Sequence, residues 1–168
     1  MRKQKGFSLI ELLIVVAIIL IIAAIAIPNL LRARMAANES SAVGSVRTLN
    51  TAEITYNSTY PTVGFAQTLA ALGSPAGTAC TPSSTQACLI DSVLTAGVKS
   101  SYNFAIPQAG NQAGGIYVQY QVTGYPITVN QTGIRAFCAV EDAVVRVQPS
   151  GAEVTGESTC QGLAPLNQ

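Results

Sequence analysis

An uninterrupted apolar segment near the N-terminus limits this chain more than any other part of its sequence. From Phe7 to Ile27 nearly every residue is Ile, Leu, Val or Ala, and Glu11 is the one charged side chain. About 20 apolar residues in a helix cross the hydrocarbon core of a bilayer. The segment also lacks the polar face that recurs every 3.6 residues in a helix on the surface of a soluble domain. It therefore predicts a helix that spans a membrane.

The charges that flank this segment predict its orientation. Arg2, Lys3 and Lys5 precede it, and no cationic residue follows until Arg32. Basic residues beside a membrane span favour the cytoplasmic side. The sequence thus predicts a single-pass protein with a cytoplasmic N-terminus and the bulk of the chain on the far side of the membrane.

Glu11 is unusual in such a segment, because a carboxylate in a membrane span carries a large free-energy penalty and usually faces a protein partner. Two interpretations remain open. The side chain lies near the cytoplasmic end, so it can reach toward the lipid headgroups of an ordinary anchor. Alternatively, its partner is a cation in another copy of the chain.

The stretch R-K-Q-K-G-F-S-L-I-E-L-L-I-V-V-A-I resembles the class III signal of type IV prepilins and of the related pseudopilins of type II secretion systems. Gly6, Phe7 and Glu11 match the Gly that ends the basic leader, the Phe that follows it, and the Glu at the fifth position after the cleavage site. Pro28 stands where many members of the type IV pilin family carry a helix-kinking Pro. The resemblance in motif is confined to this N-terminal part of the chain.

The resemblance implies a specific processing reaction. A prepilin peptidase, which is also an N-methyltransferase, would cleave between Gly6 and Phe7 and methylate the new amino terminus. Glu11 would pair with the Phe7 amine of a neighbouring subunit, and Pro28 would kink the helix. Breaking a buried ion pair typically costs about 3–5 kcal/mol, so Glu11 would favour docking in register.

The resemblance also implies a function. The chain would be a structural subunit and not an enzyme, and it would need no cofactor. Copies held in the inner membrane would pass through the inner-membrane pilus assembly machinery into an extracellular, helical type IV pilus that serves adhesion, motility or DNA uptake. Two alternatives remain: a pseudopilin of a type II secretion system, and a membrane-anchored binding module.

Two other interpretations of the apolar segment compete with this resemblance. One is an ordinary secretory signal peptide, cut before Ile27 after the A-x-A sequence Ala24–Ala26, although its apolar core is longer than the usual 7–15 residues. The other is an anchor that is never cleaved. Both leave the Gly-Phe-x3-Glu spacing unexplained.

The remaining sequence predicts one α+β domain with the pilin layout. Its long N-terminal helix would have a protruding apolar half and an amphipathic half packed on a three- to four-stranded antiparallel sheet. The expected segments are a cleaved leader at 1–6, the helix at 7–58 with its transmembrane part at 7–27, and a globular head at 59–168. Within the head we expect a connecting loop at 59–99, the sheet at 100–148 and a disulfide-tied tail at 149–168.

After Pro28 the helix becomes amphipathic. Apolar residues recur at intervals of three, four or seven, which marks one helix face. Charged and hydroxylated residues, among them Arg47, Glu39 and Glu53, are expected on a solvated face. The apolar stripe comprises Leu31, Met35, Ala42, Val46, Leu49, Ala52 and Tyr56.

The head shows strand patterns only from about residue 100. Thr68–Gly73 predicts a short helical turn before a loop rich in Ser, Thr and Pro. Gly124 and Pro126 are expected to end the best strand, and Glu141 and Asp142 to form a hairpin turn. The expected strands are 101–106, 116–123, 133–140 and 143–147, with a Gly-rich turn at 109–115.

Cysteines and charge limit the remaining chemistry. Cys80, Cys88, Cys138 and Cys160 form an even set that predicts two disulfides in an exported domain, with three connectivities to choose from. We favour the two pairings that close local loops, 80 with 88 and 138 with 160. The sequence has no His, so no metal site or catalytic constellation is expected. Without the leader, six basic side chains face eight acidic ones, which gives no charge argument for nucleic-acid binding.

Overall fold

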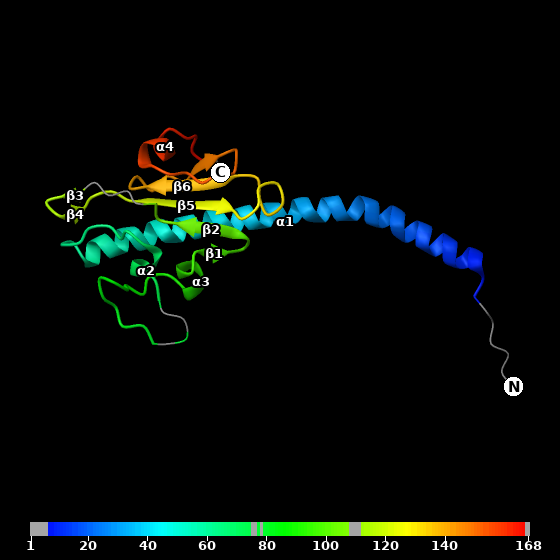
Figure 1. Ribbon diagram of the computed structural model, residues 1–168, viewed down its shortest axis with the longest axis horizontal. Coiled ribbons are helices and arrows are strands. Elements are labelled where there is room, and N and C mark those ends of the chain that lie inside the picture. Colours follow the sequence, from blue (N-terminus) through cyan, green and yellow to red (C-terminus); the bar gives the residue numbers. More distant parts are fainter. Residues whose placement is uncertain (1–6, 75–76, 78, 108–111, 167–168) are drawn as a thin grey trace. The chain divides into compact units, whose positions relative to one another are not determined.

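The computed structural model describes residues 7–74, 77, 79–107 and 112–166 (Figure 1). Contacts divide the chain into two compact units, Met1–Arg34 and Met35–Gln168, called here the N-terminal unit and the C-terminal unit. The predicted leader at 1–6, including Gly6, lies outside the described residues.

Helix α1 (Leu9–Thr59) is the longest element and agrees closely with the predicted helix at 7–58. Along its exposed side, hydroxyl groups near the C-terminal end donate to the carbonyl four residues earlier, as Thr55 does to Thr51 and Thr59 to Thr55 at 2.8 Å. The helix ends at Thr59 because Pro61 cannot continue the pattern of backbone hydrogen bonds.

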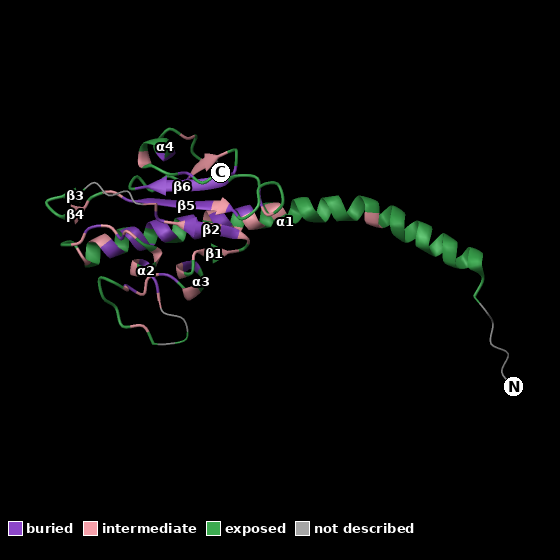
Figure 2. Cartoon of the chain, viewed as in Figure 1, coloured by how far each residue is buried: buried purple, intermediate pink, exposed green. Residues whose placement is uncertain are grey.

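The predicted apolar stripe of α1 forms the core of the C-terminal unit, where burial is concentrated in Figure 2. Its five members after residue 40 are at most 4% exposed. Leu31, which was placed in the same stripe, is 52% exposed in the N-terminal unit. The buried members are Ala42, Val46, Leu49, Ala52 and Tyr56.

This stripe covers one face of a five-stranded antiparallel sheet, as the α+β prediction requires. The strand order is β1-β2-β5-β6-β7. The strands are β1 (Val98–Lys99), β2 (Tyr102–Ala105), β5 (Gln121–Pro126), β6 (Ala136–Val140) and β7 (Arg146–Gln148). The prediction of three or four strands was wrong in number because β1 is only two residues long and carries no alternating pattern.

The strand expected at 116–123 was also wrong in its bounds. Its first residues form β4 (Ile116–Tyr117), which pairs with β3 (Gln112–Ala113), and the chain then enters the main sheet as β5. Gly114 and Gly115, at positive φ, make the tight turn between β3 and β4. Residues 109–111 of the expected Gly-rich turn lie outside the described residues.

Gly124 lies inside β5 and does not terminate it. A Cβ atom there would stand 2.9 Å from the Phe104 ring and 3.3 Å from a Val46 methyl group. The absence of a side chain therefore leaves room for the Phe104 ring and for Val46 of α1 over this part of the sheet. Pro126, the other expected terminator, is the last residue of β5 and pairs with Tyr102.

The opposite face of the sheet is covered by the C-terminal segment. Strand β6 is buried at all five positions, with Cys138 and Val140 packed against Val154 and Cys160 in a second small core. The segment was expected to be a polar tail, but it contains helix α4 (Glu157–Gln161). It then runs along the outer edge of β7, where the Val147 amide donates to the Ala164 carbonyl at 3.0 Å.

The connection between α1 and the sheet is more ordered than the loop expected at 59–99. Helix α2 (Leu69–Leu72) matches the predicted helical turn and is capped by the Thr68 hydroxyl. Helix α3 (Ser92–Thr95) was not predicted, although the Asp91 carboxylate accepts from the Leu94 amide at 2.6 Å as its N-cap. Asp91, a residue type favoured at the N-cap, was the sequence signal for the start of α3.

Candidate functional site

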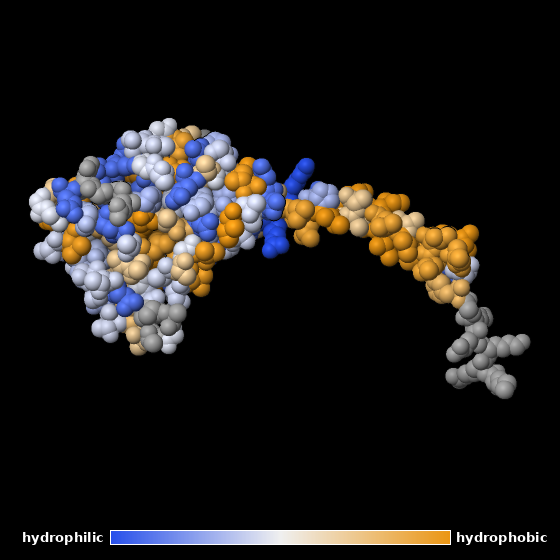
Figure 3. All heavy atoms as spheres, viewed as in Figure 1, coloured by the Kyte–Doolittle hydropathy of each residue, from blue (hydrophilic) through white to orange (hydrophobic). Residues whose placement is uncertain are grey.

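The exposed apolar part of α1 is the most unusual surface of the molecule. It contains an 18-residue window of mean hydropathy 3.3 in which no residue is buried. Among the described residues, α1 is the one helix long and apolar enough to cross a membrane. The space-filling view shows apolar side chains along this segment (Figure 3). Contiguous apolar surface of this extent marks a membrane or protein contact.

Two of the predicted site residues lie at the start of this surface. Phe7 precedes α1 with 77% of its surface exposed, and Glu11 lies in the first helical turn. The Ser8 amide donates to Glu11 Oε2 at 2.9 Å. This bond is one half of a capping box, in which a Glu at the third helical position satisfies the amide of the N-cap residue. The Ser8-x-x-Glu11 spacing is the signal of this cap in the sequence, and the capping role of Glu11 was not predicted.

This cap shows what Glu11 can do within a single chain. The carboxylate accepts a local hydrogen bond and places a negative charge near the positive end of the helix dipole. One amide does not saturate a carboxylate, which can accept about four hydrogen bonds. Glu11 therefore keeps the capacity to accept from a cationic group outside its own chain.

Pro28 lies inside α1, which continues on both sides of it. A Pro in a helix interior removes one amide donor and crowds the preceding turn. The predicted kink at Pro28 stays a prediction.

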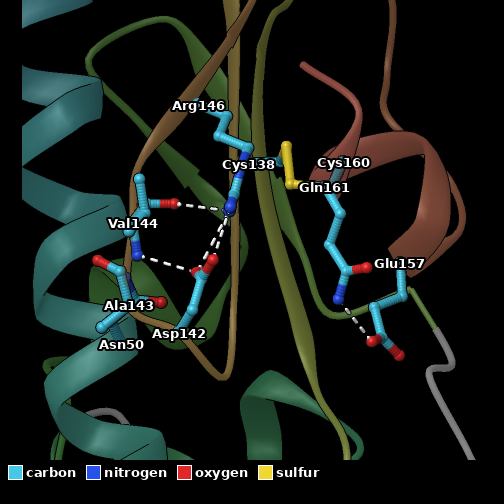
Figure 4. Close-up of polar contacts among 9 residues, drawn as sticks. All are labelled: Asn50, Cys138, Asp142, Ala143, Val144, Arg146, Glu157, Cys160 and Gln161. Carbon is cyan, nitrogen blue, oxygen red and sulfur yellow. Dashed lines mark hydrogen bonds and ion pairs between the residues drawn. A yellow bond between two sulfur atoms is a disulfide. The ribbon is translucent and has the colours of Figure 1, made fainter. Parts of the chain in front are cut away.

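The four cysteines form two disulfides, Cys80–Cys88 and Cys138–Cys160, which are the two local pairings that the sequence analysis favours. The first closes a loop beside α2. The second joins β6 to α4 across the second small core, where both residues are fully buried, and it is visible in Figure 4. Within the described part of the chain, no group of three or more His, Cys, Asp or Glu residues is placed to hold a metal ion.

Glu39 was expected on a solvated face of α1 but is 8% exposed. Its Oε1 accepts from the Ile134 and Arg135 amides at 2.8 and 3.1 Å, and its Oε2 accepts from Arg135 Nη2 at 2.7 Å. Burial alone would raise the pKa of Glu39, but the hydrogen bonds from Ile134 and Arg135 outweigh it and hold the pKa below its ordinary value. This contact fastens the loop before β6 to α1.

Glu53 was also expected in solvent and is fully buried. Its Oε2 accepts from the Ala66 amide at 2.9 Å, whereas Oε1 has no hydrogen-bond partner among the described residues. Burial raises the pKa of Glu53 to about 8, although the bond from Ala66 acts in the opposite direction. The carboxyl group is therefore mostly neutral at pH 7. Periodicity did not predict that Glu39 and Glu53 are buried, because segments outside the sheet also cover α1.

The turn after β6 was predicted at Glu141 and Asp142, and the structure has it there. Asp142 forms an ion pair with Arg146, and this bond is the main reason that its pKa is lowered (Figure 4). Glu157 in α4 accepts from Gln161 at 2.8 Å. Burial, and then a hydrogen bond with Glu141, raises the pKa of Glu157. The ion pair thus stabilises the hairpin, and the bond between Glu157 and Gln161 stabilises α4.

Comparison with known proteins finds one family model and several relatives that match part of this chain. Residues 1–27 match the family model of the prokaryotic N-terminal methylation motif. Over 40 residues, which are 24% of this chain and 30% of the relative, the chain is 68% identical to the type IV wide pilus major component PilA4 of Thermus thermophilus. Over 51 residues, 30% of this chain and 23% of the relative, it is 49% identical to the type IV major pilin protein PilA of Myxococcus xanthus.

A third relative comes from a secretion system. Over 65 residues, 37% of this chain and 44% of the relative, the chain is 43% identical to the type II secretion system core protein G of Vibrio cholerae. The chain thus covers less than half the length of each of these relatives. No solved structure matches it. The resemblance to type IV pilins and to the related secretion protein is confirmed.

Proposed function

We propose that this chain, whose first 27 residues carry the N-terminal methylation motif, is a structural subunit that assembles into a type IV pilus. The observation that carries the proposal is the apolar start of α1, which is exposed at every turn yet carries one carboxylate at its beginning. In one isolated chain in water this surface would be strongly unfavourable. A bilayer before assembly and a bundle of identical helices after assembly both remove it from water.

Processing by a prepilin peptidase and N-methyltransferase is the first step of this proposal. Cleavage between Gly6 and Phe7 would release the basic leader and leave N-methyl-Phe7 as the new terminus. The precursor would lie in the inner membrane as a single-pass protein with its N-terminus in the cytoplasm. The cations at Arg2, Lys3 and Lys5, all within the leader, support this orientation.

Pairing of Glu11 with the Phe7 amine of a neighbour is the second step. In the single chain, Glu11 accepts only from the Ser8 amide among the described residues. A terminal ammonium group would add a charge-assisted hydrogen bond, roughly twice as strong as a neutral one. Because the partner lies in another copy, this bond would draw subunits from the lipid in a fixed register.

Packing of the apolar helices against one another is the third step. It keeps out of water the surface that lipid covered before assembly, because exposure of that surface to water would cost about 25 cal/mol per Å². A contact between different surfaces of identical copies yields a helical fibre when its rotation does not close into a ring. We expect inner-membrane assembly machinery to extract the subunits, Pro28 to kink the packed helices, and the extracellular fibre to serve adhesion, motility or DNA uptake.

The intact mass and N-terminal sequence of the protein purified from its own cells test the processing step. We expect a chain that starts at N-methylated Phe7. A chain that starts at Ile27, or an unprocessed Met1, would contradict the proposal and return the segment to an ordinary signal peptide or anchor.

A matched pair of variants tests the role of Glu11. Glu11→Gln removes the charge and should abolish filaments in a fraction sheared from the cell surface, while the terminus is still processed. Glu153→Gln makes the same chemical change at an exposed site of the C-terminal unit and should leave filaments intact. Normal filaments from both variants would show that the carboxylate does not direct assembly.

A pseudopilin of a type II secretion system is the second candidate, favoured by the 43% identity to core protein G. A pseudopilin would form a short fibre below the cell surface. Deletion of the gene would then stop protein secretion. In the wild type, fractions sheared from the cell surface would contain no filaments of this protein. A third and weaker candidate, a membrane-anchored binding module, would keep its full activity after deletion of Phe7–Ile27.

A further inference from the structure

A pocket in the C-terminal unit lies between the end of α1 and the disulfide-closed loop. It has a volume of about 260 Å³ and is lined from α1, the 63–68 segment, α2, the Cys80–Cys88 loop and β4. Three aromatic rings contribute to it, those of Tyr56, Phe65 and Tyr117. No lining residue is charged.

The walls of this pocket are fixed by bonds between segments that are distant in sequence. The Phe65 amide donates to the Tyr117 carbonyl at 2.9 Å, and the Tyr117 amide donates to the Val63 carbonyl at 3.0 Å. Tyr56 donates its hydroxyl to the Ser84 carbonyl, which ties the Cys80–Cys88 loop to α1. A pre-formed pocket of this kind loses little conformational entropy when a ligand binds.

Polar groups at the pocket have unused hydrogen-bonding capacity. Among the described residues, the Tyr117 and Ser84 hydroxyls make no hydrogen bond. The Gln67 amide group makes only two long bonds, both of 3.4 Å, to the Phe65 and Ala66 carbonyls. The pocket therefore offers donors and acceptors beside aromatic rings.

These features restrict the chemistry of an occupant. A wholly apolar molecule would remove the polar side chains from water without replacing their hydrogen bonds. A charged molecule would find no opposite charge in the lining. The volume lies below the range of about 300–1,000 Å³ that is typical of drug-sized ligands. A small neutral molecule with both an apolar face and hydroxyl groups satisfies all three conditions.

We propose that this pocket binds one neutral sugar ring. The C–H face of the ring would stack on the aromatic side chains, and its hydroxyls would bond to Gln67, Tyr117 and Ser84. This inference does not rest on filament assembly, because all the residues that carry it lie in the C-terminal unit of a single chain.

The test is ligand-observed NMR titration of the full-length chain in a zwitterionic detergent that carries no sugar headgroup. The probes are methyl β-D-glucopyranoside, methyl β-D-galactopyranoside and methyl N-acetyl-β-D-glucosaminide, with glucose 6-phosphate as the charged comparison. We expect saturable binding of at least one neutral probe, with a Kd in the millimolar range, and at least tenfold weaker binding of the phosphate.

Two tyrosine variants locate the site. Tyr117→Phe removes one hydroxyl from the pocket and should weaken binding about 3- to 10-fold, the effect of one lost hydrogen bond. Tyr125→Phe makes the same change on β5, outside the pocket, and should leave binding unchanged. Gln67→Ala gives a second, independent loss.

Three outcomes would overturn the proposal. The first is that no neutral probe binds saturably up to about 50 mM, a concentration at which even a very weak site would be filled. The second is that glucose 6-phosphate binds as tightly as the neutral probes. The third is that Tyr117→Phe and Tyr125→Phe change binding equally. Because the titration is done on unassembled protein, failure here leaves the proposed assembly untouched, and failure of filament formation leaves this test valid.

Discussion

Replacement of Glu53 by Gln should remove a pH dependence from the stability of the C-terminal unit. Glu53 is fully buried, with Oε1 lacking a partner among the described residues, and its pKa rises from 4.5 to about 8 on folding. Between these two pH values the folded chain holds a proton that the unfolded chain has released. The free energy of unfolding therefore falls as the pH rises through this window.

The size of the effect follows from the width of that window. Each pH unit between 4.5 and about 8 lowers the free energy of unfolding by about 1.4 kcal/mol. The full contribution of Glu53 is therefore about 5 kcal/mol, present below pH 4.5 and lost by about pH 8. Gln keeps an oxygen that can accept from the Ala66 amide but cannot ionise, so Glu53→Gln should lack this slope.

Urea unfolding of the full-length chain in a mild detergent, followed by circular dichroism, measures the effect at several pH values from 4.5 to 9. The useful quantity is the difference between wild type and Glu53→Gln, because other titrating groups cancel in it. This difference should favour the wild type most at the acidic end and fall steadily toward pH 8. Glu153→Gln, at an exposed acid, should run parallel to the wild type. A constant difference for Glu53→Gln would refute the assignment of a buried, neutral carboxyl.

Three further predictions concern contacts of the same unit. Glu39→Gln should cost about 2 kcal/mol of unfolding free energy at pH 7, because it breaks the charged contact with Arg135. Since the pKa of Glu39 is lowered, this loss of unfolding free energy should shrink as the pH falls below about 4.5. An undiminished loss at pH 3 would contradict the ion pair with Arg135. Gly124→Ala should cost about 1–3 kcal/mol by overpacking against Phe104, and an unchanged urea midpoint would refute the close approach. Replacing Cys160 with Ser, which opens the Cys138–Cys160 disulfide, should lower the free energy of unfolding by about 3 kcal/mol. Thermal unfolding measures this loss, and a fall in Tm no larger than that caused by an exposed substitution would contradict the prediction.

The features that sequence predicted are those that arise from local pattern. The exposed apolar start of α1 depends on hydropathy alone, and the buried stripe from Ala42 to Tyr56 depends on helical period. The methylation motif depends on fixed spacing around Gly6, Phe7 and Glu11, and its match to a family model confirms it.

The features that sequence missed arise from contacts between distant segments. Gly124 has a poor strand propensity, yet the Phe104 ring and, less tightly, Val46 of α1 pack so closely there that a glycine is favoured inside β5. Glu53 has the polarity of a surface residue, and only the position of Ala66, thirteen residues on, reveals that it is buried. The periodicity of one helix cannot predict how many neighbouring segments will cover that helix.

The covered edges of the five-stranded sheet bear on how copies of this chain would meet in the proposed filament. The backbone of β7 on its outer side is occupied by the C-terminal segment, through bonds of Val147 with Ala164 and of Leu166 with Val145. At the other edge, β1 is only two residues long, too short to template another strand. A protein that is concentrated by polymerisation risks joining neighbouring sheets into amyloid-like aggregates. In the proposed filament, this route would be blocked at both edges of the five-stranded sheet, so contacts between copies would be left to helices, loops and side chains.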